Sequence, residues 1–155
     1  MLYYFDSKNP LSAVKMGKLL NTIACEKILP HQEIIILCIG SDRSTGDSLG
    51  PLIGHKLKKY ISSDIYVFGD LNQPVHAANL SYCIKTIYKT FDNPFIIAID
   101  ASLGKDEHIG YITLGTGPLK PGLGVKKRLP EVGDIHITGI VNSSRNMEFS
   151  TLQTT

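Results

Sequence analysis

The stretch that decides the fold is IIILCIGSDRSTGDSLGP, residues 34–51. It opens with six consecutive apolar residues, mostly β-branched, which are too few for a helix and typical of a strand buried on both faces. Gly40 ends this run and a polar loop follows. Apolar residues then recur at helical spacing around Gly50-Pro51, namely Leu49, Leu52, Ile53 and Leu57. The stretch predicts a strand, a loop and a helix.

The same alternation continues on both sides of this stretch. Hydrophobic periodicity predicts a helix over residues 11–27, a strand over 65–68, a helix beginning after Pro74 and a strand over 95–99. Strands that alternate with helices of this kind favour right-handed crossovers and a mainly parallel sheet covered on both faces. We therefore expect residues 1–155 to form a single α/β domain.

The pattern changes after Asp100. Strands are predicted over residues 109–114 and 135–141, joined by a segment rich in Gly and Pro, 115–134. Because long irregular segments tend to be functional, we interpret it as a flap or binding loop, with an unrecognised helix as the alternative. Few residues follow the last predicted strand, so we expect a truncated chain that lacks its closing helix.

Composition excludes several classes of function. The 155 residues are 43% hydrophobic and 19% charged, as expected of a globular domain with its own core. The net charge of +2, with scattered basic residues, argues against a nucleic-acid partner. The three cysteines, Cys25, Cys38 and Cys83, predict buried thiols in a reducing compartment, and no apolar run could span a membrane. We expect a cytoplasmic protein without a membrane partner.

Carboxylates gather where the predicted strands end. Asp42 and Asp47 follow the first core strand, Asp70 follows the second and Asp100 directly follows the third. In open α/β sheets ligands bind beyond these carboxyl ends. We expect the helix start to keep Asp47 ionised, and burial beside other anions to raise the pKa of Asp100. Such a pair can activate water with one member and protonate a leaving group with the other, as amide hydrolysis requires.

Structural explanations stand beside this one. The alternative for Asp47 is a helix-capping role, and the alternative for Asp42 and Asp70 is an ordinary role in turns. His76 begins the helix after the second strand, at the same edge, where an ordinary surface histidine is the alternative. We predict no cofactor; a divalent metal bound by Asp47 and Asp100, with or without Asp70, is a further possibility. The P-loop and GxGxxG nucleotide-binding motifs are absent from the sequence, and nothing in it identifies a serine of the loop after the first core strand as a nucleophile with an ordered base.

Five blocks of sequence resemble the YyaC family of sporulation proteins from endospore-forming bacteria: residues 39–51, 74–77, 97–101, 117–122 and 133–142. That family is similar, more distantly, to the spore germination protease and the hydrogenase maturation endopeptidases. The resemblance implies a three-layer α/β/α fold. It matches Asp47 to the first-loop acid of those peptidases and Asp100 to the acid after their third strand.

This sequence also departs from the pattern of the maturation endopeptidases. The maturation endopeptidases carry a metal-binding histidine in the stretch that corresponds to residues 115–129, and this sequence has none there. An acid-pair mechanism like that of the germination protease is therefore favoured over a nickel-guided one, with His76 as a substitute ligand only if the fold brings it close. The family also continues beyond Thr155 into a final helix, which agrees with the expected truncation.

The resemblance implies a sporulation-associated protein of the cell or spore interior, and together with the acids at the strand ends it leads us to expect that the protein hydrolyses a peptide or protein, such as a spore protein, with Asp47 and Asp100. We expect Asp42, Asp70 and His76 to support the pair, and Arg43 to orient a carboxylate or carbonyl through its fork of donors. The alternative is a non-catalytic spore protein that binds a peptide, a protein or a metal at the same edge.

Overall fold

The computed structural model describes residues 1–121 and 128–145. Within them the elements follow one another as β1 (Leu2–Asp6), α1 (Ser12–Lys27), β2 (Ile34–Cys38), the 3-10 helix η1 (Gly46–Ser48), α2 (Leu49–Leu57), β3 (Ile65–Phe68), α3 (Leu80–Thr90), β4 (Phe95–Gly104), the 3-10 helix η2 (Asp106–His108), β5 (Tyr111–Thr116) and β6 (Ile135–Ser143).

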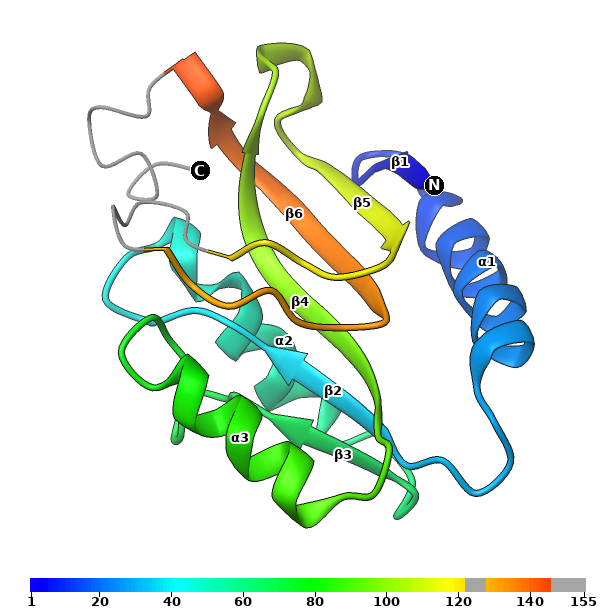
Figure 1. Cartoon of the computed structure of the whole chain (residues 1–155). Coiled ribbons are helices and arrows are strands. Elements are labelled where there is room, and N and C mark those ends of the chain that lie inside the picture. The colour runs from blue at the N-terminus through cyan, green and yellow to red at the C-terminus, as the bar shows by residue number, and fades with distance from the viewer. Residues whose placement is uncertain (122–127, 146–155) are drawn as a thin grey trace.

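The strands form one six-stranded sheet in the order β1-β5-β6-β4-β2-β3 (Figure 1). Strands β3, β2, β4 and β6 run parallel to one another, whereas β5 is antiparallel to β6 and β1 is antiparallel to β5. The predicted mainly parallel sheet is confirmed for its central strands. The antiparallel pair is an addition at one edge.

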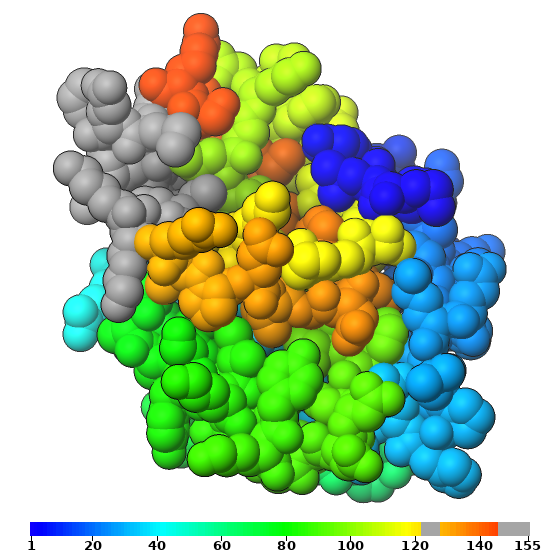
Figure 2. Space-filling view, viewed as in Figure 1, coloured from blue at the N-terminus to red at the C-terminus, as the bar shows by residue number. Residues whose placement is uncertain are grey.

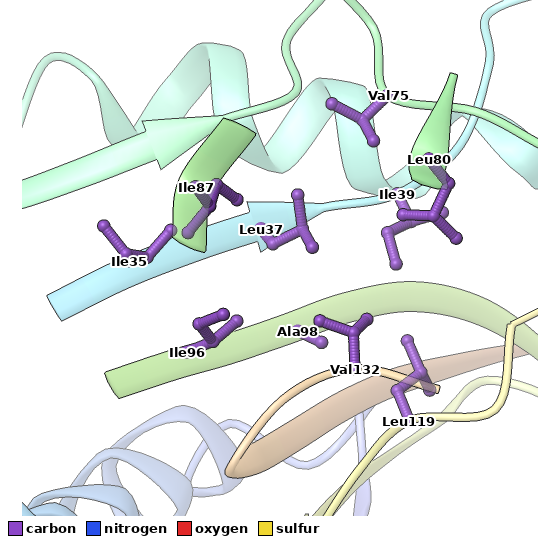
Figure 3. Packing of buried hydrophobic residues seen from close by; sticks show 10 residues of the cluster. All are labelled: Ile35, Leu37, Ile39, Val75, Leu80, Ile87, Ile96, Ala98, Leu119 and Val132. Atoms are coloured by element: carbon purple, nitrogen blue, oxygen red, sulfur yellow. The ribbon is translucent and has the colours of Figure 1, made fainter. Parts of the chain in front are cut away.

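Helices cover both faces of the sheet because the central strands are apolar on both sides. Along β4, Ile96 and Ala98 belong to the cluster that packs under α3, drawn in Figure 3, whereas Ile97 and Ile99 belong to the cluster that packs under α1 and α2. Helix α3 contributes Leu80, Cys83, Ile84 and Ile87 to the first cluster. The predicted α/β class, with helices on both faces, is confirmed.

The segment expected to be one long loop is partly regular. Strand β5 extends to Thr116, so the expected start of the loop at residue 115 was wrong. Farther on, Leu119 and Val132 exchange backbone hydrogen bonds of 2.8 and 3.1 Å, and both side chains are buried in the cluster under α3. Figure 2 shows the two arms of the loop, in yellow and orange, lying together across this face above α3. Its tip, 122–127, where the alternative helix would fall, lies outside the described residues.

Four other expectations need correction. Strand β1 was not expected, β4 continues past residue 99 to Gly104, and the helix after Pro74 begins only at Leu80. Cys25 is exposed rather than buried, because it lies on the outer side of α1, whereas Cys38 is buried and burial raises the pKa of its thiol to about 12. The expected truncation concerns residues beyond Arg145, which lie outside the described part of the chain. No helix within the described residues is long and apolar enough to cross a bilayer.

Candidate functional site

The residue after β2 brings two distant chain segments together. Ile39 donates its N–H to the carbonyl oxygen of Ile99 (2.7 Å) and forms a parallel bridge with Val75. Asp100 directly follows Ile99, and His76 directly follows Val75. Both functional candidates therefore stand beside the carboxyl end of β2, as the strand-edge argument predicts.

The loop after β2 folds back so that Asp47 joins them. The N–H of Ser41 donates to the backbone carbonyl of Asp47 (3.0 Å), which closes the loop just before α2. Gly40 adopts a φ of +145°, and a Cβ there would lie only 2.1 Å from the carbonyl oxygen of Asp47. Glycine is required at this position for both reasons. The close approach fixes η1, and Asp47 with it, against the end of β2.

Asp100 is a nearly buried carboxyl group, with 4% of its surface exposed. Its Oδ1 accepts the N–H of Ala101 (2.8 Å). Burial raises the pKa of Asp100 well above its usual range, the negative charge of Asp47 raises it further, and the Ala101 N–H offsets part of this shift. The expected rise is found, and Asp100 favours its protonated form.

Asp47 is half-buried, and burial also raises its pKa. A hydrogen bond from the Ser41 backbone and the charge of His76 act in the opposite direction but do not outweigh burial. We expected the helix start to favour the charged form, and the net shift has the other sign. Asp47 nevertheless remains the more readily ionised member of the pair, because it is less buried than Asp100.

Asp70 is paired with Lys58 and not with the other candidate acids. Its Oδ2 lies 2.5 Å from the ammonium of Lys58, and its Oδ1 accepts the N–H groups of Asn72 (2.9 Å) and Gln73 (2.6 Å). These contacts, the one with Lys58 first, lower the pKa of Asp70. The charge of Asp70 is not among the causes that shift Asp47 or Asp100. The structure thus brings together Asp47, Asp100 and His76, and leaves Asp70 in an ion-paired turn.

Asp42 and Arg43 are exposed in the loop after β2. The N–H of Arg43 donates to Ser41 Oγ (3.2 Å), which holds the turn. Neither charge is among the causes that shift the pKa of Asp47 or Asp100. A role of Arg43 in orienting a substrate stays a prediction.

A cavity of about 540 Å³ opens beside His76, between β3, the following loop and α3. Its lining includes Phe68, Tyr82 and Cys83 as apolar or aromatic groups, together with Lys58 and Asn79. Sequence reasoning missed Lys58 and Asn79. One signal in the sequence pointed to Asn79: it follows His76 by three residues, and asparagine is common where helices begin. Their partners come from tertiary contacts that no local pattern reveals.

A three-residue metal site is not assembled among residues 1–121 and 128–145. Of the possible ligands Asp47, Asp70 and Asp100, Asp70 is paired with Lys58. Asp47 and Asp100 remain the oxygen ligands that a divalent ion would meet at this edge.

The sequence has identifiable relatives. The family described as "Protein of unknown function (DUF1256)" matches residues 4–155. "Uncharacterized protein YyaC" of Bacillus subtilis (strain 168) is 56% identical over 122 residues, which are 79% of this chain and 60% of that protein. The aligned part of the chain thus spans about 60% of the length of this relative.

Among solved structures, the [NiFe] hydrogenase maturation protease HycI from Thermococcus kodakarensis KOD1 aligns with a TM-score of 0.43 and 17% identity, over 82% of this chain and 91% of that chain. The expected resemblance to YyaC is confirmed by the sequence match. Because the family match covers nearly all of the sequence, the chain belongs to the family described as "Protein of unknown function (DUF1256)".

Proposed function

We propose that this protein is a peptidase in which Asp47 and Asp100 act as a pair on a water molecule and a peptide bond. One observation carries the proposal: two carboxyl groups from separate segments meet at the carboxyl end of β2, and burial together with the charge of Asp47 raises the pKa of Asp100. Pairs of acids whose environments push their pKa values apart are typical of acid-base catalysis.

The two carboxyl groups have different roles because they differ in protonation state. Asp47, the more readily ionised member, takes a proton from water as the water oxygen bonds to the carbonyl carbon of the peptide. Asp100, the protonated member, gives its proton to the leaving nitrogen as the C–N bond breaks. Each turnover consumes one water, and Asp47 returns its proton to Asp100 through solvent. The positions of proton donor and acceptor thus match the charges that the two environments favour.

The cavity beside His76 offers room for the substrate. Its volume of about 540 Å³ and its aromatic and apolar lining suit one or two side chains of a peptide. The motif resemblance to a family of sporulation proteins supports a role in sporulation and a protein substrate of the spore. The peptide, on this proposal, lies across the end of the sheet with its side chains toward α3.

Cleavage by the purified protein tests the proposal. Small acid-soluble spore proteins and a spore extract are incubated with the parent, Asp47→Asn and Asp100→Asn, and discrete fragments are identified by mass spectrometry. We expect each variant to lose about a hundredfold or more of the cleavage rate. Asp92→Asn, at an exposed aspartate in the turn before β4, is the control and retains the parental rate. Fragments that both site variants still produce at the parental rate contradict the acid pair.

A second candidate function is non-catalytic binding at the same edge, favoured by the near-complete burial of Asp100. In that case a folded parent yields no fragments at any pH between about 5 and 8. A spore peptide then raises the melting temperature of the parent without being cut.

A divalent ion bridging the pair is part of neither proposal. It would appear as a metal-dependent rise in melting temperature that either Asn variant abolishes.

A further inference from the structure

We propose that the loop before α3 holds the His76 ring in the tautomer that carries its proton on Nε2, so that His76 donates a hydrogen bond to the carbonyl oxygen of the substrate. The tautomer is argued from the described contacts alone. The donor role rests on the proposed function.

The backbone sets the tautomer. Nδ1 of His76 accepts the N–H of Ala78 at 3.2 Å. A backbone amide nitrogen can only donate, so Nδ1 must present its lone pair, and the proton of a neutral imidazole must reside on Nε2. The nitrogen left for other partners is therefore a donor.

Asn79 holds the turn that makes this contact. Its Oδ1 accepts the N–H of His76 (2.8 Å), and its Nδ2 donates to the carbonyl oxygen of Pro74 (3.0 Å). The carbonyl of His76 in turn accepts the N–H groups of Asn79 (3.1 Å) and Leu80 (2.9 Å). The Asn79 side chain thus ties the backbone of Pro74 and His76 to the start of α3, and Asn79 is a positioning residue.

The turn is also anchored to the sheet. Gly40 donates its N–H to the carbonyl of Val75, the residue before His76, at 2.8 Å. One end of the turn therefore cannot move without breaking the contact with the end of β2 that also positions Asp47 and Asp100. The ring belongs to the same rigid unit as the acid pair.

The surroundings of the ring suit a donor. His76 lines the cavity beside α3 and lies near Asp47. Lys58 also lines this cavity, and its ammonium is paired with Asp70. A peptide carbonyl that enters from the cavity would meet the Nε2–H of His76, which would stabilise negative charge developing on that oxygen. No proton is transferred by the ring in this role.

NMR of the ¹⁵N-labelled protein tests the tautomer directly. Two-bond ¹H–¹⁵N correlations of the His76 ring, assigned by comparison with His76→Gln, are recorded above about pH 8, where an ordinary histidine is neutral. We expect the pattern of a proton on Nε2. A proton on Nδ1, or an equal mixture of both tautomers, overturns the inference.

Variants of Asn79 separate positioning from general stability. Asn79→Ala should convert the single tautomer of His76 into a mixture, and Asn79→Ser, which restores an acceptor for the His76 N–H, should recover much of the parental pattern. Asn21→Ala, at an exposed asparagine of α1, is the matched control and leaves the ring unchanged. An unaltered His76 pattern in Asn79→Ala contradicts the positioning role.

Cleavage tests the donor role. His76→Gln can place an amide N–H near the position of Nε2, so we expect a rate within about tenfold of the parent, whereas His76→Ala falls by about a hundredfold. Equal rates in both variants overturn the donor role. If the parent cleaves no substrate, the proposed function fails, and the ring measurement alone decides the inference.

Discussion

Asp100 is placed where ionisation is disfavoured, and that placement has a measurable effect on stability. Burial and the charge of Asp47 raise its pKa above the value near 3.9 of an unfolded chain. The folded state therefore holds the proton more tightly than the unfolded state. The contribution of Asp100 to the free energy of unfolding is fully present below the pKa that it has in the unfolded chain, and it is lost as the pH rises through the pKa that it has in the folded protein.

We expect Asp100→Asn to be more stable than the parent at pH 7, because asparagine cannot ionise and its Oδ1 still accepts the Ala101 N–H. The advantage should disappear near pH 4 and below, where the parent is protonated in both states. Urea unfolding of both proteins over a pH series measures it. A variant that is less stable than the parent at pH 7 would contradict this account of Asp100.

Asp70→Asn should have the opposite effect. Lys58 and two backbone N–H groups lower the pKa of Asp70, so its contribution is present above the unfolded pKa and is lost as the pH falls through the folded pKa. The side chain of Lys58 is 45% exposed, and with that screening we expect a loss of about 1–2 kcal/mol at pH 7. The same unfolding series measures this variant. A stability loss that does not shrink as the pH falls below the unfolded pKa of about 3.9 would show that packing, not charge, is responsible.

At the scale of elements, α2 lies unusually close to the strands that end at the site. Gly50 and Gly54 are one turn apart on this helix. A Cβ on Gly50 would lie 2.1 Å from the carbonyl oxygen of Ile39, and a Cβ on Gly54 would lie 1.9 Å from that of Gly69. Both obstacles are backbone atoms, which cannot rotate away as the end of a side chain can. The helix can therefore pack here only with glycine at both positions.

We predict that Gly54→Ala destabilises the protein by about 2 kcal/mol or more, although alanine is the better helix former by about 1 kcal/mol. Gly17→Ala is the matched control, because Gly17 is exposed on α1 and, apart from the nearby backbone of its own helix, no atom lies within 4 Å of its added Cβ. That change should stabilise by about 0.5–1 kcal/mol. Thermal and urea unfolding compare the two. Equal effects of the two substitutions would contradict the close packing of α2.

The central elements were predictable because their signals are local. Parallel strands buried on both faces are continuous apolar runs, which is why β2, β3 and the first half of β4 match the expected ranges. Strand β1 was missed since its partner, β5, is far away in the sequence. Helix α3 starts later than expected because side-chain contacts of His76 and Asn79 hold the preceding residues in a turn.

The candidate site was predictable in its location but not in its details. The rule that ligands bind beyond parallel strand ends selected Asp47, Asp100 and His76, which the fold brings together. The same rule selected Asp70, but a lysine twelve residues away in the sequence removes it from the group. The net pKa shift of Asp47 was also missed, because burial depends on how the whole loop packs. Such contacts exist only in the folded chain.

At the scale of the whole molecule, β1 joins the N-terminus to the far edge of the sheet. Phe5 packs in the cluster under α1 and α2, whereas Leu2, on the other face of the strand, is 49% exposed. We expect Phe5→Ala to cost about 2–3 kcal/mol and Leu2→Ala less than about 1 kcal/mol. Urea midpoints of the two variants check this. Equal losses of stability in the two variants would contradict the idea that β1 is held mainly by the side chains that face α1.

This arrangement also sets an order of assembly during synthesis. Met1 contacts Thr116, 115 residues later, and β5 reaches the rest of the sheet only through β6, the last strand to leave the ribosome among those described. Strands β2, β3 and β4 have neighbours made before or soon after them and can pair early. Strand β1, which is translated before the other described elements, therefore waits without its partner until β5 and β6 are made, as a latch that closes a sheet already built.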